Sequence, residues 1–204
     1  MKHEIAKLTT RQKQALETRQ RLLEASLTVF LENGFQKATI SQIIKKAKTG
    51  YGTAYVYFQN KDEIFMELME HVMEKFYEVA KCPFEPKTKK EAYDMIQHQV
   101  RLFLNLAVQE RKIMKVVKEA IGVSPIIEKK WQEIRERFIK RITEDIQYSQ
   151  QNKLAKTDLN SNLVARAWFY ANEMFMWELV NQEESSIDEI VLHLTTMYTS
   201  GLYV

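Results

Sequence analysis

Residues 39–65, TISQIIKKAKTGYGTAYVYFQNKDEIF, decide the fold that we expect for this chain. Thr39 and Gln42 have the spacing of a capping box, in which the hydroxyl accepts an N–H of the first turn and the Gln side chain returns to the cap. A short helix is therefore predicted from about Ile40. Its helical spacing assigns a buried face to Ile40, Ile43, Ile44 and Ala47.

A turn separates this helix from a second one. Gly50 and Gly52 permit a sharp reversal, because glycine adopts backbone conformations that strain other residues. We expect the second helix over about residues 51–57, and a longer helix capped by Asn60 with Glu63 three positions on. Two short helices joined by a tight turn are the geometry that places one helix in the DNA major groove.

The second helix is poor in charge but carries groups that fit a DNA groove. Gly52 leaves room for close approach, Thr53 can hydrogen-bond a base edge, and tyrosines can hydrogen-bond phosphates. Lys61 would bring a cation and a helix N-terminus to one phosphate. The predicted DNA-contacting residues are Thr39, Lys48, Thr49, Gly50, Tyr51, Gly52, Thr53, Tyr55, Tyr57 and Lys61.

This stretch resembles the N-terminal domain of TetR-family transcriptional regulators. The resemblance rests on Gly52-Thr53 followed by aromatic-x-aromatic-Phe-x-x-Lys-acid-acid-aliphatic over 55–64, and on Phe-Leu-Glu-Asn-Gly-Phe at 30–35. It covers roughly residues 15–65, and it implies a homodimer that represses transcription. The family often has Gly where Lys48 stands and Ser or Thr where Gly50 stands. These two differences would shift the turn and the cap of the second helix by one residue, and with them the residues assigned to base contacts.

Composition and length agree with an all-α protein. Of 204 residues, 45% are hydrophobic and 28% are charged, and five Gly and three Pro disfavour an all-β fold. A single cysteine, Cys82, excludes an intramolecular disulfide; we expect a packed thiol, with redox sensing as the alternative. No apolar run of membrane-spanning length occurs and the N-terminus is too polar for a signal peptide, so we expect a cytoplasmic protein.

The charge is unevenly distributed along the chain. Residues 1–61 carry eleven Lys and Arg against four Glu, a net charge of +7, whereas residues 62–204 carry −4. A basic N-terminal part suits phosphate binding, and a solvated basic face is the alternative. We expect a DNA-binding domain over 1–60, with a frayed arm over 1–14 that follows DNA or only aids solubility. A larger ligand-binding and dimerisation domain is expected over 61–204.

About nine helices are expected in all. Besides the two short ones, they lie over about 14–33, 61–81, 88–108, 111–120, 125–151, 158–181 and 186–203. Gly34 is expected to end the first as a C-terminal cap. Ser124 and Asp158 are expected to cap the helices that follow them, and Ser186 and Glu189 form another capping box.

The last two helices are rich in large apolar residues. A helix that is apolar on more than one face needs two burial partners, and a second subunit would supply one through a four-helix bundle. A thick monomeric core is the alternative. The predicted dimer interface comprises Trp168, Phe175, Leu179, Ile190, Leu194, Met197 and Tyr198.

Polar residues that interrupt the apolar faces of the helical domain are candidates for an effector site. Pockets in helical bundles are mostly apolar with a few convergent polar groups, although each such residue can equally be ordinary core or surface. The many Met, Phe and Ile residues suggest a lipophilic ligand. The candidates are His98, Arg101, Asn105, Trp131, Arg135, Tyr170, Glu173 and Trp177.

Enzyme chemistry is not expected. A di-metal carboxylate site in a helical bundle needs Glu-x-x-His, whereas His71, His98 and His193 are preceded at that spacing by apolar residues. No phosphate-binding glycine loop or nucleophile elbow occurs either. We expect no cofactor and no metal. The sequence predicts a homodimeric repressor that a small lipophilic effector releases from a pseudo-palindromic operator; a helical protein-interaction scaffold without DNA binding is the alternative.

Overall fold

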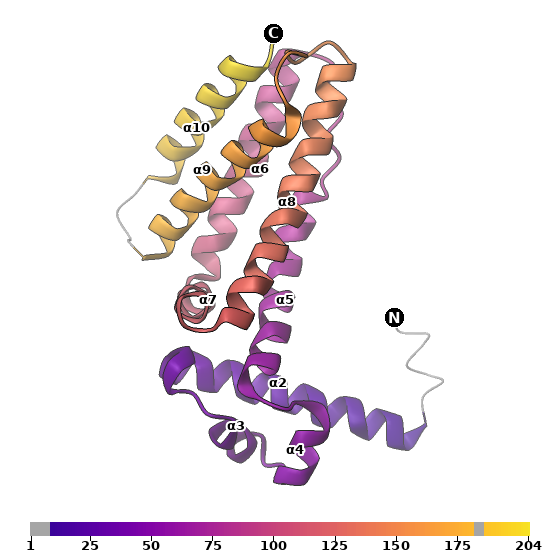
Figure 1. The fold of residues 1–204 in the computed structure, drawn as a ribbon, viewed down its shortest axis with the longest axis vertical. Helices are drawn as coiled ribbons and strands as arrows, with labels where there is room; N and C mark the ends of the chain where they lie inside the picture. Colours follow the sequence, from indigo (N-terminus) through magenta and orange to yellow (C-terminus); the bar gives the residue numbers. More distant parts are fainter. Residues whose placement is uncertain (1–8, 182–185) are drawn as a thin grey trace. The chain divides into compact units, whose positions relative to one another are not determined.

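The computed structural model describes residues 9–181 and 186–204, and this part of the chain is all-α (Figure 1). The nine helices in these residues are α2 (Thr10–Lys37), α3 (Ile40–Ala47), α4 (Tyr51–Tyr57), α5 (Lys61–Ala80), α6 (Lys89–Gln109), α7 (Arg111–Val123), α8 (Pro125–Gln151), α9 (Ser161–Asn181) and α10 (Ile187–Leu202). The predicted class and the predicted number of helices are confirmed. None of the described helices has the length and apolarity needed to cross a membrane.

Contacts divide the chain into two compact units. The N-terminal unit ends at His71 but also includes Val116–Glu128, and the C-terminal unit consists of Val72–Lys115 and Lys129–Val204. Helices α5, α7 and α8 therefore contribute residues to both units. The functional division at residue 60 stays a prediction.

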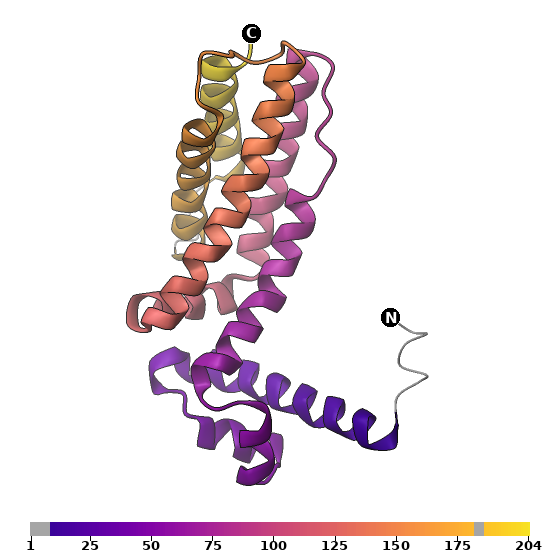
Figure 2. The ribbon, with the colours of Figure 1, turned by 45° about the vertical axis from the view of Figure 1, so that its right-hand side comes forward.

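In the N-terminal unit, α3 packs against α2, and α4 contacts both of them (Figures 1 and 2). Three phenylalanines form the centre of this core: the Phe65 ring meets the rings of Phe30 and Phe35 edge-on, with centroids 4.9 and 5.0 Å away. Ile43 and Ile44 of α3 are fully buried, as their helical spacing predicted. These contacts hold the two short helices on a rigid base.

Helix α2 begins earlier than expected. Thr9 and Gln12 form a reciprocal capping box, so the helix starts at Thr10 and the prediction of an arm is wrong for residues 10–14. Residues 1–8 of that arm lie outside the described part of the chain. Gly34 has a φ of 73°, which confirms a break at this glycine, and the chain then makes one more turn to Lys37.

The C-terminal unit is a bundle in which α6, α8, α9 and α10 run alongside one another (Figures 1 and 2). Helix α6 packs against α9 and α10. The predicted caps Ser124 and Ser186 each accept a hydrogen bond from an N–H of the turn that follows, and Thr88 does the same at the start of α6. The predicted cap Asp158 is wrong: Asn160 Oδ1 accepts the N–H of Leu163 at 3.0 Å, so α9 begins at Ser161.

Candidate DNA-binding surface and effector site

The two short helices have the predicted bounds, and α3 has the predicted capping box. In α3, Thr39 Oγ1 accepts the Gln42 N–H at 3.2 Å, and the Thr39 N–H donates to Gln42 Oε1 at 2.8 Å. Helix α4 spans Tyr51–Tyr57 and buries Ala54 against its neighbours. The helix-turn-helix predicted from the sequence is therefore present.

The turn between α3 and α4 is made differently from the prediction. Lys48 occupies the left-handed region at φ 51° and ψ 44°, while Gly50 is extended at φ −77° and Gly52 lies inside α4. The Lys48 N–H donates to Lys45 O, and the Thr49 N–H donates to Ile44 O at 3.3 Å. These bonds hold a non-glycine residue in a conformation that costs it roughly 1–2 kcal/mol. Lys48, and not the two glycines, reverses the chain.

One side of α4 faces solvent. Tyr51 is 57% and Tyr55 is 40% exposed, and Thr53 is also exposed. A Cβ built on Gly52 would meet no atom within 4 Å. Packing within the described chain therefore does not require glycine at this position, and the open space beside it is available to another molecule.

Lys61 has a structural partner that the sequence did not reveal. Its Nζ donates to the carbonyl oxygens of Phe35, Gln36 and Ala38 at 2.8, 3.2 and 3.2 Å, and it lies 4.6 Å from the Phe35 ring centroid. A cation at the C-terminal carbonyls of a helix stabilises its end. Lys61 therefore caps α2, and its predicted contact with phosphate remains a prediction.

The segment that follows α6 contacts both the end of α2 and the start of α5. Glu119 of α7 accepts the N–H groups of Phe35 and Gln36 at 3.0 and 2.9 Å. Ser124, at the start of α8, donates its hydroxyl to Asp62 at 2.5 Å. Sequence reasoning missed both contacts, because 62 to 84 residues separate the partners.

The predicted effector residues separate into two groups. Glu173 is only 4% exposed. Its carboxylate accepts hydrogen bonds from Trp131 Nε1 at 2.6 Å and from Arg135 Nε at 2.9 Å. Trp177 Nε1 lies 3.4 Å from the same carboxylate, and the Arg135 guanidinium lies 5.7 Å from the Tyr170 ring. The remaining candidates lie elsewhere: His98 is exposed, Asn105 is half-buried, and Arg101 pairs with Asp188.

A cavity of about 100 Å³ lies within the C-terminal unit, and none of those eight residues lines it. Its walls are mostly aromatic and aliphatic side chains from α5, α6, α8, α9 and α10. In the sequence these residues are indistinguishable from core. The lining consists of Phe76, Val79, Ala80, Phe84, Ile96, Gln99, Val100, Phe103, Phe138, Arg141, Ile142, Asp145, Trp168, Phe169, Asn172, Tyr198 and Tyr203.

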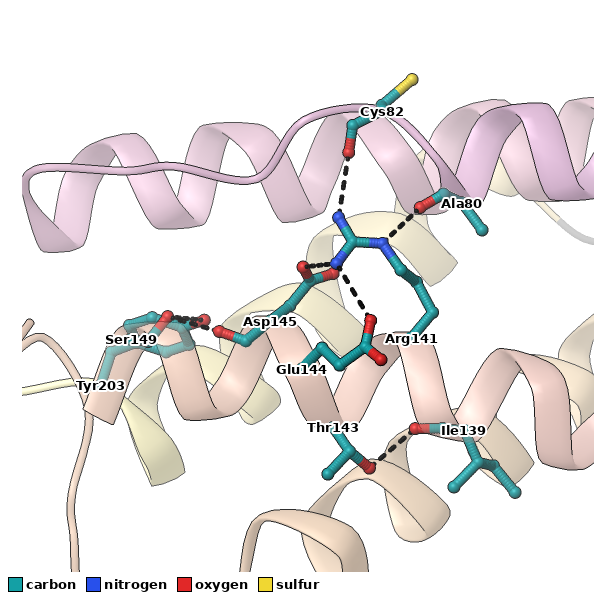
Figure 3. Close-up of polar contacts among 9 residues, drawn as sticks. All are labelled: Ala80, Cys82, Ile139, Arg141, Thr143, Glu144, Asp145, Ser149 and Tyr203. Carbon is teal, nitrogen blue, oxygen red and sulfur yellow. Dashed lines mark hydrogen bonds and ion pairs between the residues drawn. The ribbon is translucent and has the colours of Figure 1, made fainter. Parts of the chain in front are cut away.

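Arg141 and Asp145 form the charged part of this lining (Figure 3). Arg141 Nη1 lies 2.5 Å from Asp145 Oδ1 and 3.9 Å from Glu144 Oε2. The other guanidinium nitrogens point at main-chain oxygens: Nε donates to Ala80 O at 3.1 Å, and Nη2 donates to Cys82 O at 3.4 Å. Burial raises the pKa of Asp145 to about 7, although Arg141 opposes this shift.

Two tyrosines also belong to the polar part of the cavity, together with Gln99 and Asn172. The Tyr203 hydroxyl lies 3.2 Å from Ser149 Oγ, and burial raises the pKa of Tyr203 to about 12. Burial also raises the pKa of Tyr198, whose ring stacks on Trp168 at 4.1 Å between centroids. Both phenols are therefore neutral hydrogen-bonding groups at neutral pH.

The residues predicted for the dimer interface differ in exposure. Trp168, Leu179 and Leu194 are buried within the subunit, so they belong to its core and have little surface to offer a partner. Phe175, Ile190 and Tyr198 are half-buried, and Met197 is 64% exposed. The exposed apolar side chains of α9 and α10 include Leu163, Tyr170, Met174, Leu192 and Met197.

A helix-turn-helix with a solvent-facing second helix, followed by a helical bundle, defines a DNA-binding transcriptional regulator. Residues 22–68 match the family model of bacterial regulatory proteins of the tetR family, and residues 96–204 match that of the C-terminal domain of the transcriptional regulator EthR. The second match covers more than half of the chain. The chain belongs to the TetR family of transcriptional regulators, a non-enzymatic family.

Individual relatives support the same assignment. An uncharacterised HTH-type regulator of Bacillus subtilis, YdeS, is 28% identical over 148 residues, which are 72% of this chain and 69% of YdeS. Several other curated relatives match over only 28–33% of their own length. Salmonella enterica GusR has a similar fold, with a TM-score of 0.73 at 20% identity over 95% of this chain and 97% of GusR. The SmeT–triclosan complex has a TM-score of 0.72 at 16% identity over 92% of both chains.

Family membership removes the alternative of a scaffold without DNA binding. Within residues 9–181 and 186–204, no group of three or more His, Cys, Asp or Glu residues is placed to hold a metal ion.

Proposed function

We propose that the protein is a homodimeric repressor that leaves a pseudo-palindromic operator when a small lipophilic effector fills the cavity of the C-terminal unit. The observation that carries the proposal is the exposed side of α4, where Tyr51, Thr53 and Tyr55 surround the open space at Gly52. We also keep the prediction that the protein acts in the cytoplasm.

On DNA, α4 enters the major groove and α3 lies across the backbone. Thr53 and the tyrosines of α4 meet bases and phosphates, while the exposed cations of Lys45 and Lys48 neutralise phosphates near the turn. Helix α4 itself has no charged residue, so its contacts with bases must come from hydrogen bonds and van der Waals packing at short range. Gly52, which has no side chain, allows the helix to approach the bases that closely.

The cavity supports the effector part of the proposal. Its walls are dominated by Phe, Trp, Val and Ile side chains, as expected for a lipophilic molecule. SmeT, which shares the fold, has been solved in complex with triclosan, so the fold admits a small molecule in at least one relative.

Helix α5 is the proposed link between effector and DNA. Arg141, which lines the cavity, holds the Ala80 carbonyl at the end of α5, and the same helix begins at Lys61, which caps α2. A ligand that shifts Arg141 changes the support of one end of a continuous helix. Release from DNA requires that the ligand bind the DNA-free conformation more tightly.

Dimerisation supplies the second DNA-binding unit for a two-fold operator. Leu163, Tyr170 and Met174 are exposed and recur at seven and four residues along α9, so they share one face of that helix. An apolar face of this kind suits a symmetric helix–helix interface. We therefore propose this face, together with Met197 of α10, as part of the interface.

The test selects bound fragments from the genomic DNA of the source organism and then measures their affinity by fluorescence anisotropy. The proposal predicts a shared pseudo-palindrome bound by two chains, and release of that fragment by a lipophilic metabolite. Binding of all duplexes with equal affinity, or of one chain per site, would contradict it.

A further inference from the structure

Building on the proposed effector site, we infer that the cavity takes a hydrophobic cation, an organic ammonium with an aromatic or aliphatic body, and that the Asp145 carboxylate is its counter-ion. The inference rests on which groups of the lining are free to bind charge. It concerns the chemical class of the effector only.

The cavity walls suit the body and the charge of such a ligand. Phe76, Phe103, Phe138, Phe169 and Trp168 all contribute to the lining. Aromatic faces attract cations as well as apolar groups, and this attraction is stronger where water is excluded. An organic ammonium therefore loses less on leaving water here than it would in an aliphatic cavity.

Arg141 is not free to receive an anion. Binding a carboxylate through two parallel hydrogen bonds needs two N–H groups on one edge of the guanidinium. The edge formed by Nε and Nη2 already donates to the carbonyls of Ala80 and Cys82, and Nη1 faces Asp145 (Figure 3). An anionic ligand would have to displace the main chain at the end of α5 or separate the ion pair.

Asp145 has the opposite character. It lines the cavity and shares the guanidinium of Arg141 with Glu144, an exposed residue outside the lining. Among the described residues, Asp145 is therefore the one carboxylate that the lining side chains present to a ligand. Burial raises its pKa to about 7, which means that its charge is incompletely compensated. The other titratable groups that face it are Tyr198 and Tyr203, which are neutral at neutral pH. A second cation beside Asp145 would supply the missing compensation.

The test compares three ligands of similar size by isothermal titration calorimetry on the full chain without DNA: 2-phenylethylammonium, 2-phenylethanol and 3-phenylpropanoate. We expect the ammonium to bind at least tenfold more tightly than the alcohol at pH 8, and the carboxylate to bind most weakly. Lowering the pH to 6 should weaken ammonium binding several-fold, because Asp145 gains a proton, and should leave the alcohol unaffected.

Two variants separate the carboxylate from general effects. Asp145→Asn keeps the size and polarity of the side chain, and it should bring the ammonium to the affinity of the alcohol. Asp94→Asn is the matched control, because Asp94 is an exposed aspartate of α6 paired with Lys90 and does not line the cavity. It should leave all three affinities unchanged.

Three results would overturn the inference: tighter binding of the alcohol or the carboxylate, an ammonium preference that persists in Asp145→Asn, or no binding of any of the three at millimolar concentration. These results do not depend on DNA. The role of the chain as a DNA-binding regulator is tested separately by the operator selection above, so either can fail without the other.

Discussion

The carboxylate of Glu119 in α7 accepts the main-chain N–H of Phe35 at 3.0 Å, just after the chain leaves the first part of α2. The bond depends on Gly34, whose φ of 73° turns the amides of the next residues away from the helix. The partners are 84 positions apart in the sequence. The turn at Gly34 is signalled locally by its glycine, but a tertiary contact also supports it.

Gly34→Ala should destabilise the protein for two reasons. The positive φ strains any residue with a Cβ, and a Cβ at this position would lie 2.6 Å from Glu119 Oε2. We expect the free energy of unfolding in urea to fall by about 1–3 kcal/mol. Gly122→Ala is the control, because its Cβ meets no atom within 4 Å, and it should be neutral or slightly stabilising. Equal effects of the two changes would refute this explanation.

Lys61→Ala should reduce stability as well as DNA affinity. Removing the ammonium leaves three main-chain oxygens without their donor, which should lower the free energy of unfolding by about 1–3 kcal/mol. If Lys61 also contacts a phosphate, the slope of log affinity against log salt should fall by about 1. Lys37→Ala, an exposed lysine in the last turn of α2, controls for loss of charge. An unchanged unfolding energy would exclude the capping role.

Lys48→Gly should stabilise the turn between α3 and α4. Glycine occupies the left-handed region without the strain that a Cβ imposes, so we expect a gain of about 0.5–1 kcal/mol in chemical denaturation. Lys45→Gly, in the last turn of α3, should lose about 1 kcal/mol because its backbone is helical. A loss of stability in Lys48→Gly would show that the lysine side chain has a structural role of its own.

The stability of the protein should depend on pH through Asp145. Its pKa is raised from 3.8 to about 7 on folding, so between these values the folded state binds more protons than the unfolded state. This group therefore favours folding at pH 5, and the advantage is lost as the pH rises through 7. Relative to the wild type, Asp145→Asn should gain about 1–3 kcal/mol of unfolding free energy between pH 5 and pH 8. If Asp145→Asn instead lost unfolding free energy relative to the wild type over this pH range, the ion pair with Arg141 would outweigh the cost of burying the carboxylate.

Local signals predicted the helices well. The capping box at Thr39 and the side-chain caps at Asn60 and Ser186 each involve partners three residues apart, so the sequence contains the whole interaction. The fold class followed from these caps and from helical spacing. The residue that reverses the chain between α3 and α4 was mispredicted. The sequence favoured Gly50 and Gly52, whereas hydrogen bonds to the last carbonyls of α3 hold Lys48 in the left-handed conformation.

Contacts between distant segments were not predictable in the same way. The capping of α2 by Lys61 joins residues 23 to 26 positions apart, and the cavity lining comes from five helices and the segments beside them. Trp131 and Glu173 were expected to bind a ligand, but a buried carboxylate needs hydrogen bonds, and these residues satisfy one another. Polarity within an apolar face therefore identified an internal network and missed a cavity whose walls resemble core.

The most direct test of the central claim, that α4 is the surface that meets DNA, is the operator affinity of Gly52→Ala, measured by fluorescence anisotropy alongside thermal unfolding. Because an added methyl group meets no atom within 4 Å, the fold should be unchanged or slightly more stable. We expect the affinity to fall at least tenfold, since the methyl group fills the space that DNA would occupy. A folded Gly52→Ala protein with unchanged operator affinity would contradict the account.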